Sequence, residues 1–179
     1  MSLAQIGQRL ERSSGEIFRM LAALERRGYL ARGPRPEQYM LTHKLYELAH
    51  RHPPAKRILA CALPAMEELA QKVQQSCHLA VRHGDAALIV AQVDCPGFTG
   101  FSVRVGATAP LVDCCSGRVL LSFQDAPTRK TWIGAALMAS KDGTTAAALN
   151  PLLSNIAHQG WHRQESRIHP GIVDFGAPV

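Results

Sequence analysis

Residues 13–42 read SSGEIFRMLAALERRGYLARGPRPEQYMLT, and this stretch decides the fold of the first third of the chain. Apolar residues recur at helical spacing through Ile17–Leu24, a serine precedes them as a possible cap, and Gly28 follows as a stop. Two short extended runs then flank the turn at 33–36. The stretch therefore predicts a helix over 14–27, followed at once by a β-hairpin whose tip carries an arginine.

A second helix is predicted immediately upstream of this stretch. Ser2–Glu11 reads SLAQIGQRLE, with apolar residues on one helical face and Ser2 as a plausible N-cap. A tight break over 12–15 separates the two helices. Two helices joined by a short turn and followed by a hairpin are typical of a winged helix-turn-helix. We predict this DNA-binding domain over residues 1–42.

The charge of the chain is concentrated in its first third. Residues 1–60 hold eleven Lys and Arg against five acids, whereas residues 61–179 hold nine of each sign. The whole net charge of +6 therefore belongs to the first sixty residues. A basic module on a neutral body is typical of a protein with a polyanionic partner, although a basic solvated face without any partner fits the charge alone equally well.

A linker and a second domain are predicted after residue 42. Residues 43–52 continue as a helix, which Pro53-Pro54 should end, and a second amphipathic helix is expected over Ile58–Gln75. We place a linker helix at 43–57 and the second domain at 58–179.

The spacing of apolar residues changes from that of a helix to that of a strand after Cys77. Strands are predicted at 78–82, 87–93 and 101–105, and extended chain returns at Trp161 and over 172–179. Helices are predicted between these runs, at about 115–124, 127–139 and 145–158. The mixture indicates an α+β domain with an antiparallel sheet.

Composition narrows the possible environment. No apolar run reaches the length of a membrane span, and the N-terminus lacks the pattern of a secretory signal, so a cytoplasmic protein is expected, without a membrane partner. The five cysteines are scattered and should be reduced. Cys77, His78 and His83 match no zinc-ligand spacing, and we predict no metal and no cofactor.

Colinear short motifs resemble the IclR family of bacterial transcriptional regulators. They are LAQI at 3–6, EIFRML at 16–21, LERRGYL at 24–30, YMLT at 39–42, PAM at 64–66, SCHLAV at 76–81, VG at 105–106, SGRVLL at 116–121, GWHRQE at 160–165, Gly171 and APV at 177–179. The resemblance implies a winged helix-turn-helix followed by a GAF-like α/β effector domain. It also implies a homodimer, or a dimer of dimers, on a double-stranded DNA operator.

The sequence departs from the family pattern in three places. The family has a further helix before the position of Met1, and more strands and a helix after Val179, so the effector domain is expected to be incomplete. The family's Ser-Thr pair at the start of the recognition helix is replaced by Gly15-Glu16.

DNA contacts are predicted on the second helix and on the hairpin, because the start of a recognition helix faces base edges in the major groove and a wing contacts phosphates. Arg19 could read guanine or bind a phosphate. Alternatively, Arg19 is an ordinary solvated surface residue without a role in binding. The predicted DNA-binding residues are Ser13, Ser14, Glu16, Ile17, Arg19, Arg26, Arg32 and Arg35.

The resemblance also implies where a small-molecule effector binds. Free N–H groups at a helix start beside a glycine favour a small carboxylate, and effectors of the family are often organic or aromatic acids. Ser116 could instead merely cap its helix. The implied effector residues are Ser102, Leu111, Cys114, Cys115, Ser116, Gly117, Gln164 and Glu165.

The sequence favours a regulator over an enzyme. One alternative is a cysteine-based enzyme, or a redox-sensing ligand-binding module, that uses Cys114 or Cys115 near a helix start. Another is a sensor or protein-interaction module whose winged helix binds another protein. No nucleophile elbow and no glycine-rich phosphate loop accompany these cysteines.

Overall fold

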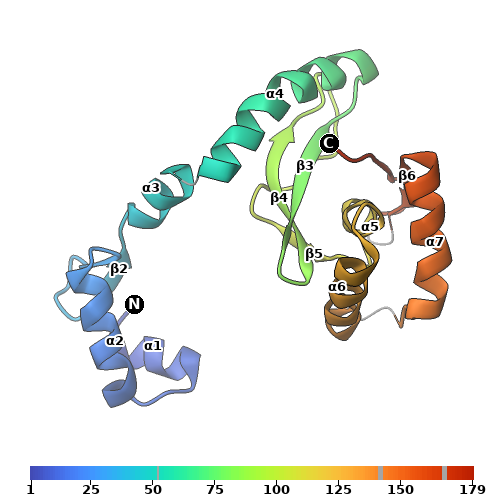
Figure 1. Cartoon of the computed structure of the whole chain (residues 1–179). Helices are drawn as coiled ribbons and strands as arrows, with labels where there is room; N and C mark the ends of the chain where they lie inside the picture. The colour runs from blue at the N-terminus through green and yellow to red at the C-terminus, as the bar shows by residue number, and fades with distance from the viewer. Residues whose placement is uncertain (52, 141–142, 167–168) are drawn as a thin grey trace. The chain divides into compact units, whose positions relative to one another are not determined.

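The computed structural model describes residues 1–51, 53–140, 143–166 and 169–179 (Figure 1). The chain divides into two compact units, Met1–Ile58 and Leu59–Val179. Each unit has a hydrophobic cluster of its own, and the two are described separately.

The first unit opens with two short helices and a hairpin, in the predicted order. Helices α1 (Leu3–Leu10) and α2 (Ser14–Arg26) precede strands β1 (Leu30–Arg32) and β2 (Tyr39–Leu41). A capping box starts each helix, through Ser2 with Gln5 and through Ser13 with Glu16. Both boxes satisfy backbone N–H groups that lack a partner at a helix start, which explains why such short helices begin where they do.

The hairpin is fixed to α2 by a small apolar core. Ile17, Leu21 and Tyr39 are buried, and Leu3, Ile6 and Leu30 pack against them. Strands β1 and β2 pair antiparallel, with Leu30 opposite Leu41 and Arg32 opposite Tyr39. Gly28 adopts φ +76° just after α2, a conformation that suits glycine and turns the chain from the helix into the hairpin.

Two helices connect the hairpin with the second unit. They are α3 (Lys44–Arg51) and α4 (Pro53–Val73). The first helix ends before Pro53-Pro54, as predicted. The prediction that the next helix begins at Ile58 is wrong, because α4 already begins at Pro53. Proline lacks an N–H and has a fixed φ, and both properties suit a first helical position. The predicted linker helix includes His52, which lies outside the described residues.

The second unit contains antiparallel strands, as predicted. Strands β3 (Cys77–His83), β4 (Ala86–Val93) and β5 (Thr108–Pro110) form one sheet, and β6 (His162–Glu165) pairs with β7 (Val173–Gly176). The predicted strand at 101–105 is wrong, because the chain pairs with β4 only after the turn at Gly106. Before this turn the Val103 N–H donates to a side chain, Gln92 Oε1, at 3.3 Å.

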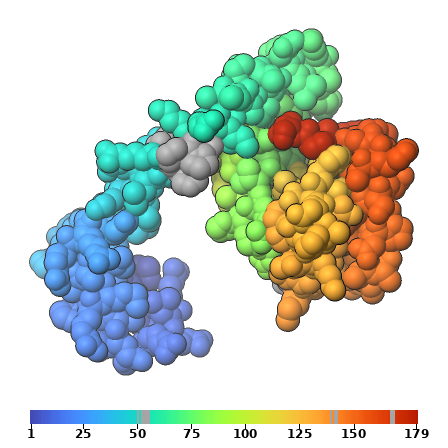
Figure 2. Space-filling view, in the orientation of Figure 1, coloured from blue at the N-terminus to red at the C-terminus, as the bar shows by residue number. Residues whose placement is uncertain are grey.

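Three helices gather on one side of the β3–β4–β5 sheet (Figure 1). They are α5 (Cys115–Ser122), α6 (Ala126–Ala139) and α7 (Ala146–Gln159). Their apolar faces and β4 form the core of this unit, which includes Ala87, Leu111, Val112, Val119, Leu121, Ile133, Ala136, Leu149, Leu153 and Ile156. In the space-filling view α6 and α7 form a continuous surface over this core (Figure 2). The predicted α+β class is confirmed.

Within the described residues, no helix is both long and apolar enough to cross a membrane.

Candidate nucleic-acid interface and ligand site

The start of α2 is held by a reciprocal pair of side chains. The Ser13 N–H and hydroxyl donate to Glu16 Oε2 at 2.9 and 2.8 Å, and the Glu16 N–H donates back to Ser13 Oγ at 3.4 Å. These hydrogen bonds from Ser13 lower the pKa of Glu16. Both side chains thus complete the helix start, and reading a base would require them to exchange these bonds for new ones.

The predicted DNA-binding residues of α2 do not all lie on its exposed face. Ile17 is only 2% exposed and packs with Leu21 and Tyr39. Its side chain cannot reach a base without leaving the core, so we remove Ile17 from the predicted set. Ser14, Arg19 and Arg26 are exposed and remain in it.

The hairpin differs from the prediction in the role of Arg32. Its guanidinium donates to Glu25 through Nε and Nη2, at 2.8 and 3.0 Å, and to the Pro36 carbonyl through Nη1 at 3.1 Å. The same group lies over the Tyr39 ring, 4.3 Å from its centre. Arg32 therefore joins the hairpin to α2, whereas Arg35 is exposed in the turn at the hairpin's tip.

Helix α5 begins at an unusual cap. Cys114 is the N-cap residue, and its Sγ accepts from the Gly117 N–H at 3.3 Å. The alternative that Ser116 merely caps this helix is therefore wrong. The Ser116 hydroxyl instead lies 3.1 Å from His78 Nε2 on β3. Burial lowers the pKa of His78, an effect that Asp174 partly opposes, and this favours the neutral ring at neutral pH.

Gly117 allows the start of α5 to touch the preceding turn. A Cβ atom at this position would lie 2.3 Å from the Leu111 carbonyl oxygen and 2.5 Å from the Leu111 Cα. Leu111 itself is fully buried and belongs to the core. The glycine is thus required for packing, and Leu111 supplies the wall behind the helix start rather than an accessible contact.

The β6–β7 hairpin lies against the other side of α5. Gln164 Nε2 donates to the Asp113 carbonyl at 2.7 Å, and the Cys115 thiol lies 3.6 Å from the His162 carbonyl oxygen. Within the described part of the chain, two buried atoms of this hairpin have no hydrogen-bond partner, namely His162 Nε2 and Gln164 Oε1. Such atoms are rare inside proteins and are polar groups that a ligand or a water molecule could satisfy.

The two neighbouring thiols are not activated. Burial raises the pKa of Cys114, and burial together with Asp174 and Cys114 raises the pKa of Cys115 to about 12. Because the thiolate is the reactive form, very little of either cysteine is nucleophilic at neutral pH.

Two of the implied effector residues lie apart from the start of α5. Glu165 is exposed, and its carboxylate pairs with Arg163 at 3.2 Å. Ser102 is exposed in the loop before Gly106. That loop is nevertheless connected to the site, because Val103 bonds to Gln92 and Gln92 pairs across the sheet with His78. The remaining six implied residues come together: Leu111, Cys114, Cys115, Ser116, Gly117 and Gln164.

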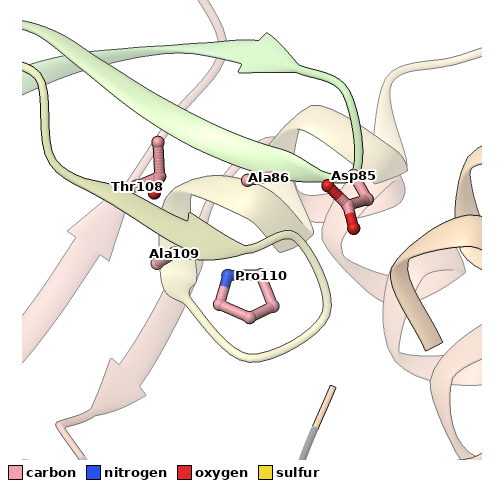
Figure 3. Close-up of a pocket in the computed structure, with 5 residues that line it drawn as sticks. All are labelled: Asp85, Ala86, Thr108, Ala109 and Pro110. Carbon is pink, nitrogen blue, oxygen red and sulfur yellow. The ribbon is translucent and has the colours of Figure 1, made fainter. Parts of the chain in front are cut away.

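A shallow hollow lies at the end of the β3–β4 hairpin, with a volume of about 140 Å³. Figure 3 shows Asp85 at the hairpin turn and the Pro110 ring on the adjacent strand β5. Among the residues that the structure describes, its lining includes none of the implied effector residues, and Asp85 is the one charged side chain in it.

The chain matches known proteins along its whole length. The model of the family described as bacterial transcriptional regulator IclR, C-terminal, matches residues 54–179. The chain belongs to the IclR family.

Individual IclR-family proteins are similar over both units. The HTH-type transcriptional regulator KdgR of Escherichia coli K12 is 26% identical over 182 residues, which cover 100% of this chain and 69% of KdgR. An IclR-type regulator of Silicibacter sp. TM1040 has the same fold, with a TM-score of 0.80 at 14% identity over 100% of this chain and 72% of its own. An IclR homologue of Microbacterium hydrocarbonoxydans, solved in complex with 4-hydroxybenzoate, has a TM-score of 0.70 at 26% identity and covers 91% of this chain and 68% of its own.

Sequence reasoning missed several residues that shape these sites. His78 and Asp174 lie beside the start of α5, and Gln92 pairs with His78 across the sheet. Nothing in the local pattern of their strands distinguishes these residues. The pairing of Glu25 with a basic residue could have been predicted from the sequence. Glu25 is an acid in the last turn of a helix, where the helix dipole disfavours negative charge, and this suggests a basic partner close by.

Proposed function

We propose that this IclR-family chain is a transcription regulator that binds duplex DNA through its first unit and a small effector through its second. The observation that carries the proposal is the location of charge: the whole net charge of +6 lies in residues 1–60. The two helices and the hairpin over residues 1–42 hold seven arginines against four acids, and residues 43–60 in α3 and the start of α4 hold the rest of the excess. The exposed surface of residues 1–42 includes Arg19, Arg26 and Arg35.

The mode of DNA binding follows from exposure. The N-terminal half of α2 offers Ser14 and Arg19 to base edges or phosphates of the major groove, and the hairpin tip offers Arg35 to the backbone. Phosphate contacts release counterions, so the affinity should fall steeply with salt.

The effector site in this proposal is the start of α5. The helix N-terminus, the Ser116 hydroxyl with His78, and the half-buried Gln164 amide supply several polar groups at this place. A helix N-terminus favours an anion, so we assign a small carboxylate, and the bound 4-hydroxybenzoate of the Microbacterium homologue supports an aromatic acid as the first probe.

Self-association completes the proposal. Helix α3 carries Leu45 and Leu48 with 52% and 45% of their surfaces exposed, on a segment that also exposes Leu41. A second copy of the chain would cover such residues, and a dimer would place two reading helices on two half-sites, as twofold symmetry requires. Pairs of dimers would extend the same arrangement.

The experiment is fluorescence anisotropy of a labelled duplex with the full chain, from about 50 to 200 mM salt. The wild type should lose affinity steeply with salt, and Arg35→Ala should weaken binding to all duplexes and flatten the slope by about one. Arg82→Ala, at an exposed position on β3 of the second unit, is the control and should change neither quantity. Affinity that is independent of salt would contradict the proposal.

The cysteine-based alternative has less support. A nucleophilic or redox-sensing thiol needs a depressed pKa, and the pKa values of Cys114 and Cys115 are both raised. Rapid labelling of Cys115 in the folded protein near neutral pH would revive this alternative.

A further inference from the structure

Glu25 is an acid in the most basic part of the molecule, on the same unit that carries the net charge of +6. It sits in the last turn of α2, where a carboxylate faces the negative end of the helix dipole. Simple electrostatics therefore predicts that removing this charge should favour DNA binding. The contacts of Glu25 indicate the opposite.

The carboxylate of Glu25 on α2 binds Arg32 on strand β1 of the hairpin. It accepts two parallel hydrogen bonds from Arg32, from Nε at 2.8 Å and from Nη2 at 3.0 Å. This two-point geometry defines the orientation of the guanidinium plane, which a single contact would not. About 30% of the Glu25 side chain and 45% of the Arg32 side chain are exposed, so the pair is partly sheltered from solvent.

Arg32 also contacts the turn at the tip of the hairpin. Its remaining amino group donates to the Pro36 carbonyl at 3.1 Å, and its guanidinium lies over the buried ring of Tyr39. Pro36 directly follows Arg35 in the chain. The contacts therefore connect the end of α2, both strands of the hairpin, and the turn that displays the exposed arginine.

We infer that Glu25 and Arg32 are positioning residues that hold the hairpin tip against α2 so that Arg35 reaches the DNA backbone. This inference rests on the proposed DNA-binding function. It assigns Arg32 to the geometry of the wing rather than to a phosphate, and it makes an acidic side chain necessary for binding a polyanion.

The test compares two acids that lie in the same basic unit. Glu25→Gln and Glu37→Gln remove the same charge, but only Glu25 is paired with Arg32. DNA affinity of the full chain should fall about twofold to fivefold in Glu25→Gln, the range typical of one exposed ion pair, and stay equal or rise in Glu37→Gln. Arg32→Lys keeps the charge but loses the two-point contact, and should weaken binding to a similar extent.

A double-mutant cycle separates positioning from a general loss of stability. If Glu25 acts through the tip, Arg35→Ala should cost less affinity in the Glu25→Gln background than in the wild type. Additive effects would overturn the inference, as would a Glu25→Gln protein that binds as well as Glu37→Gln.

Amide exchange without DNA gives a readout that does not depend on the proposed function. The Gly33 N–H, which donates to the Gln38 carbonyl at 2.8 Å, should exchange faster in Glu25→Gln and unchanged in Glu37→Gln. Unchanged exchange in Glu25→Gln overturns the inference. A wild-type chain that fails to bind DNA while its exchange responds as expected would instead overturn the proposed function, and with it the role of Glu25 in binding.

Discussion

At the residue scale, the proposed ligand site depends on residues that their local sequence does not distinguish. Ser116 and Gly117 could be identified because they open a helix, but Ser116 contacts His78, which lies 38 positions earlier in the chain. Contacts of this kind depend on which strand packs beside the helix, and that is decided by the whole core. Ile17, which was predicted as a DNA contact, is buried for the same reason, because it packs with Leu21 and with Tyr39 on a later strand.

Gly117 gives a sharp stability prediction. The added Cβ of Gly117→Ala would meet backbone atoms of Leu111, which cannot move as a flexible side chain could. Urea unfolding should show a loss of about 1–3 kcal/mol, the usual cost of overpacking. The matched control is Gly134→Ala on α6, where nothing lies within 4 Å of the added atom.

Gly134→Ala should leave the free energy of unfolding unchanged or raise it by about 0.5–1 kcal/mol, because alanine favours a helix. Equal losses in the two variants would show that the close approach of α5 to Leu111 is not as described.

Half-buried His78 and buried His162 predict how stability depends on pH. Burial lowers the pKa of His78 and of His162 below the ordinary value of 6.5, and Arg118 lowers the pKa of His162 further. The unfolded chain therefore binds protons before the folded one does. The neutral histidines should therefore contribute their full stabilisation above about pH 6.5, and the free energy of unfolding should fall as the pH drops below that value.

Thermal unfolding between about pH 8 and pH 5 measures this effect. His78→Asn cannot take up the proton, so its unfolding temperature should fall less steeply over this range than that of the wild type. The comparison is made relative to each protein's own value at the highest pH. Identical slopes would contradict the assignment of His78.

At the element scale, the sequence predicted helices and hairpins well where caps and turns are local. The serines before α1 and α2, Gly28, and the turn after His83 fix their elements with few distant contacts. The strand predicted at 101–105 failed because its alternating pattern suits a strand, but the neighbouring stretch 108–110 occupies the edge of β4. Pattern alone cannot show which of two segments pairs with a given strand.

Helix α3 carries the prediction for self-association. Leu48→Glu places a charge among exposed apolar residues of this helix and should shift the sedimentation-equilibrium mass from a multiple of 19.5 kDa towards the monomer. Met138→Glu on α6, where the side chain is 92% exposed, is the control and should leave the mass unchanged. A wild-type chain that is already monomeric at micromolar concentrations would remove α3 from the proposed dimer.

At the scale of the whole molecule, positive charge and buried polar groups belong to different units. The first unit holds the excess of arginine and lysine, and the second holds the larger core with His78, His162 and Gln164 beside α5. A ligand in the second unit can change DNA affinity only if it binds two arrangements of the protein unequally. In the proposed function the two sites lie on different units, so ligand control of DNA affinity would have to act through the connecting helices α3 and α4.

Hydrogen–deuterium exchange of the full chain, with and without a saturating DNA duplex, tests whether the first unit binds DNA. We expect slower amide exchange in α2 and in the hairpin turn between β1 and β2, and unchanged exchange in α6 and α7. Protection confined to α6 and α7, or no protection anywhere at saturating DNA, would contradict it.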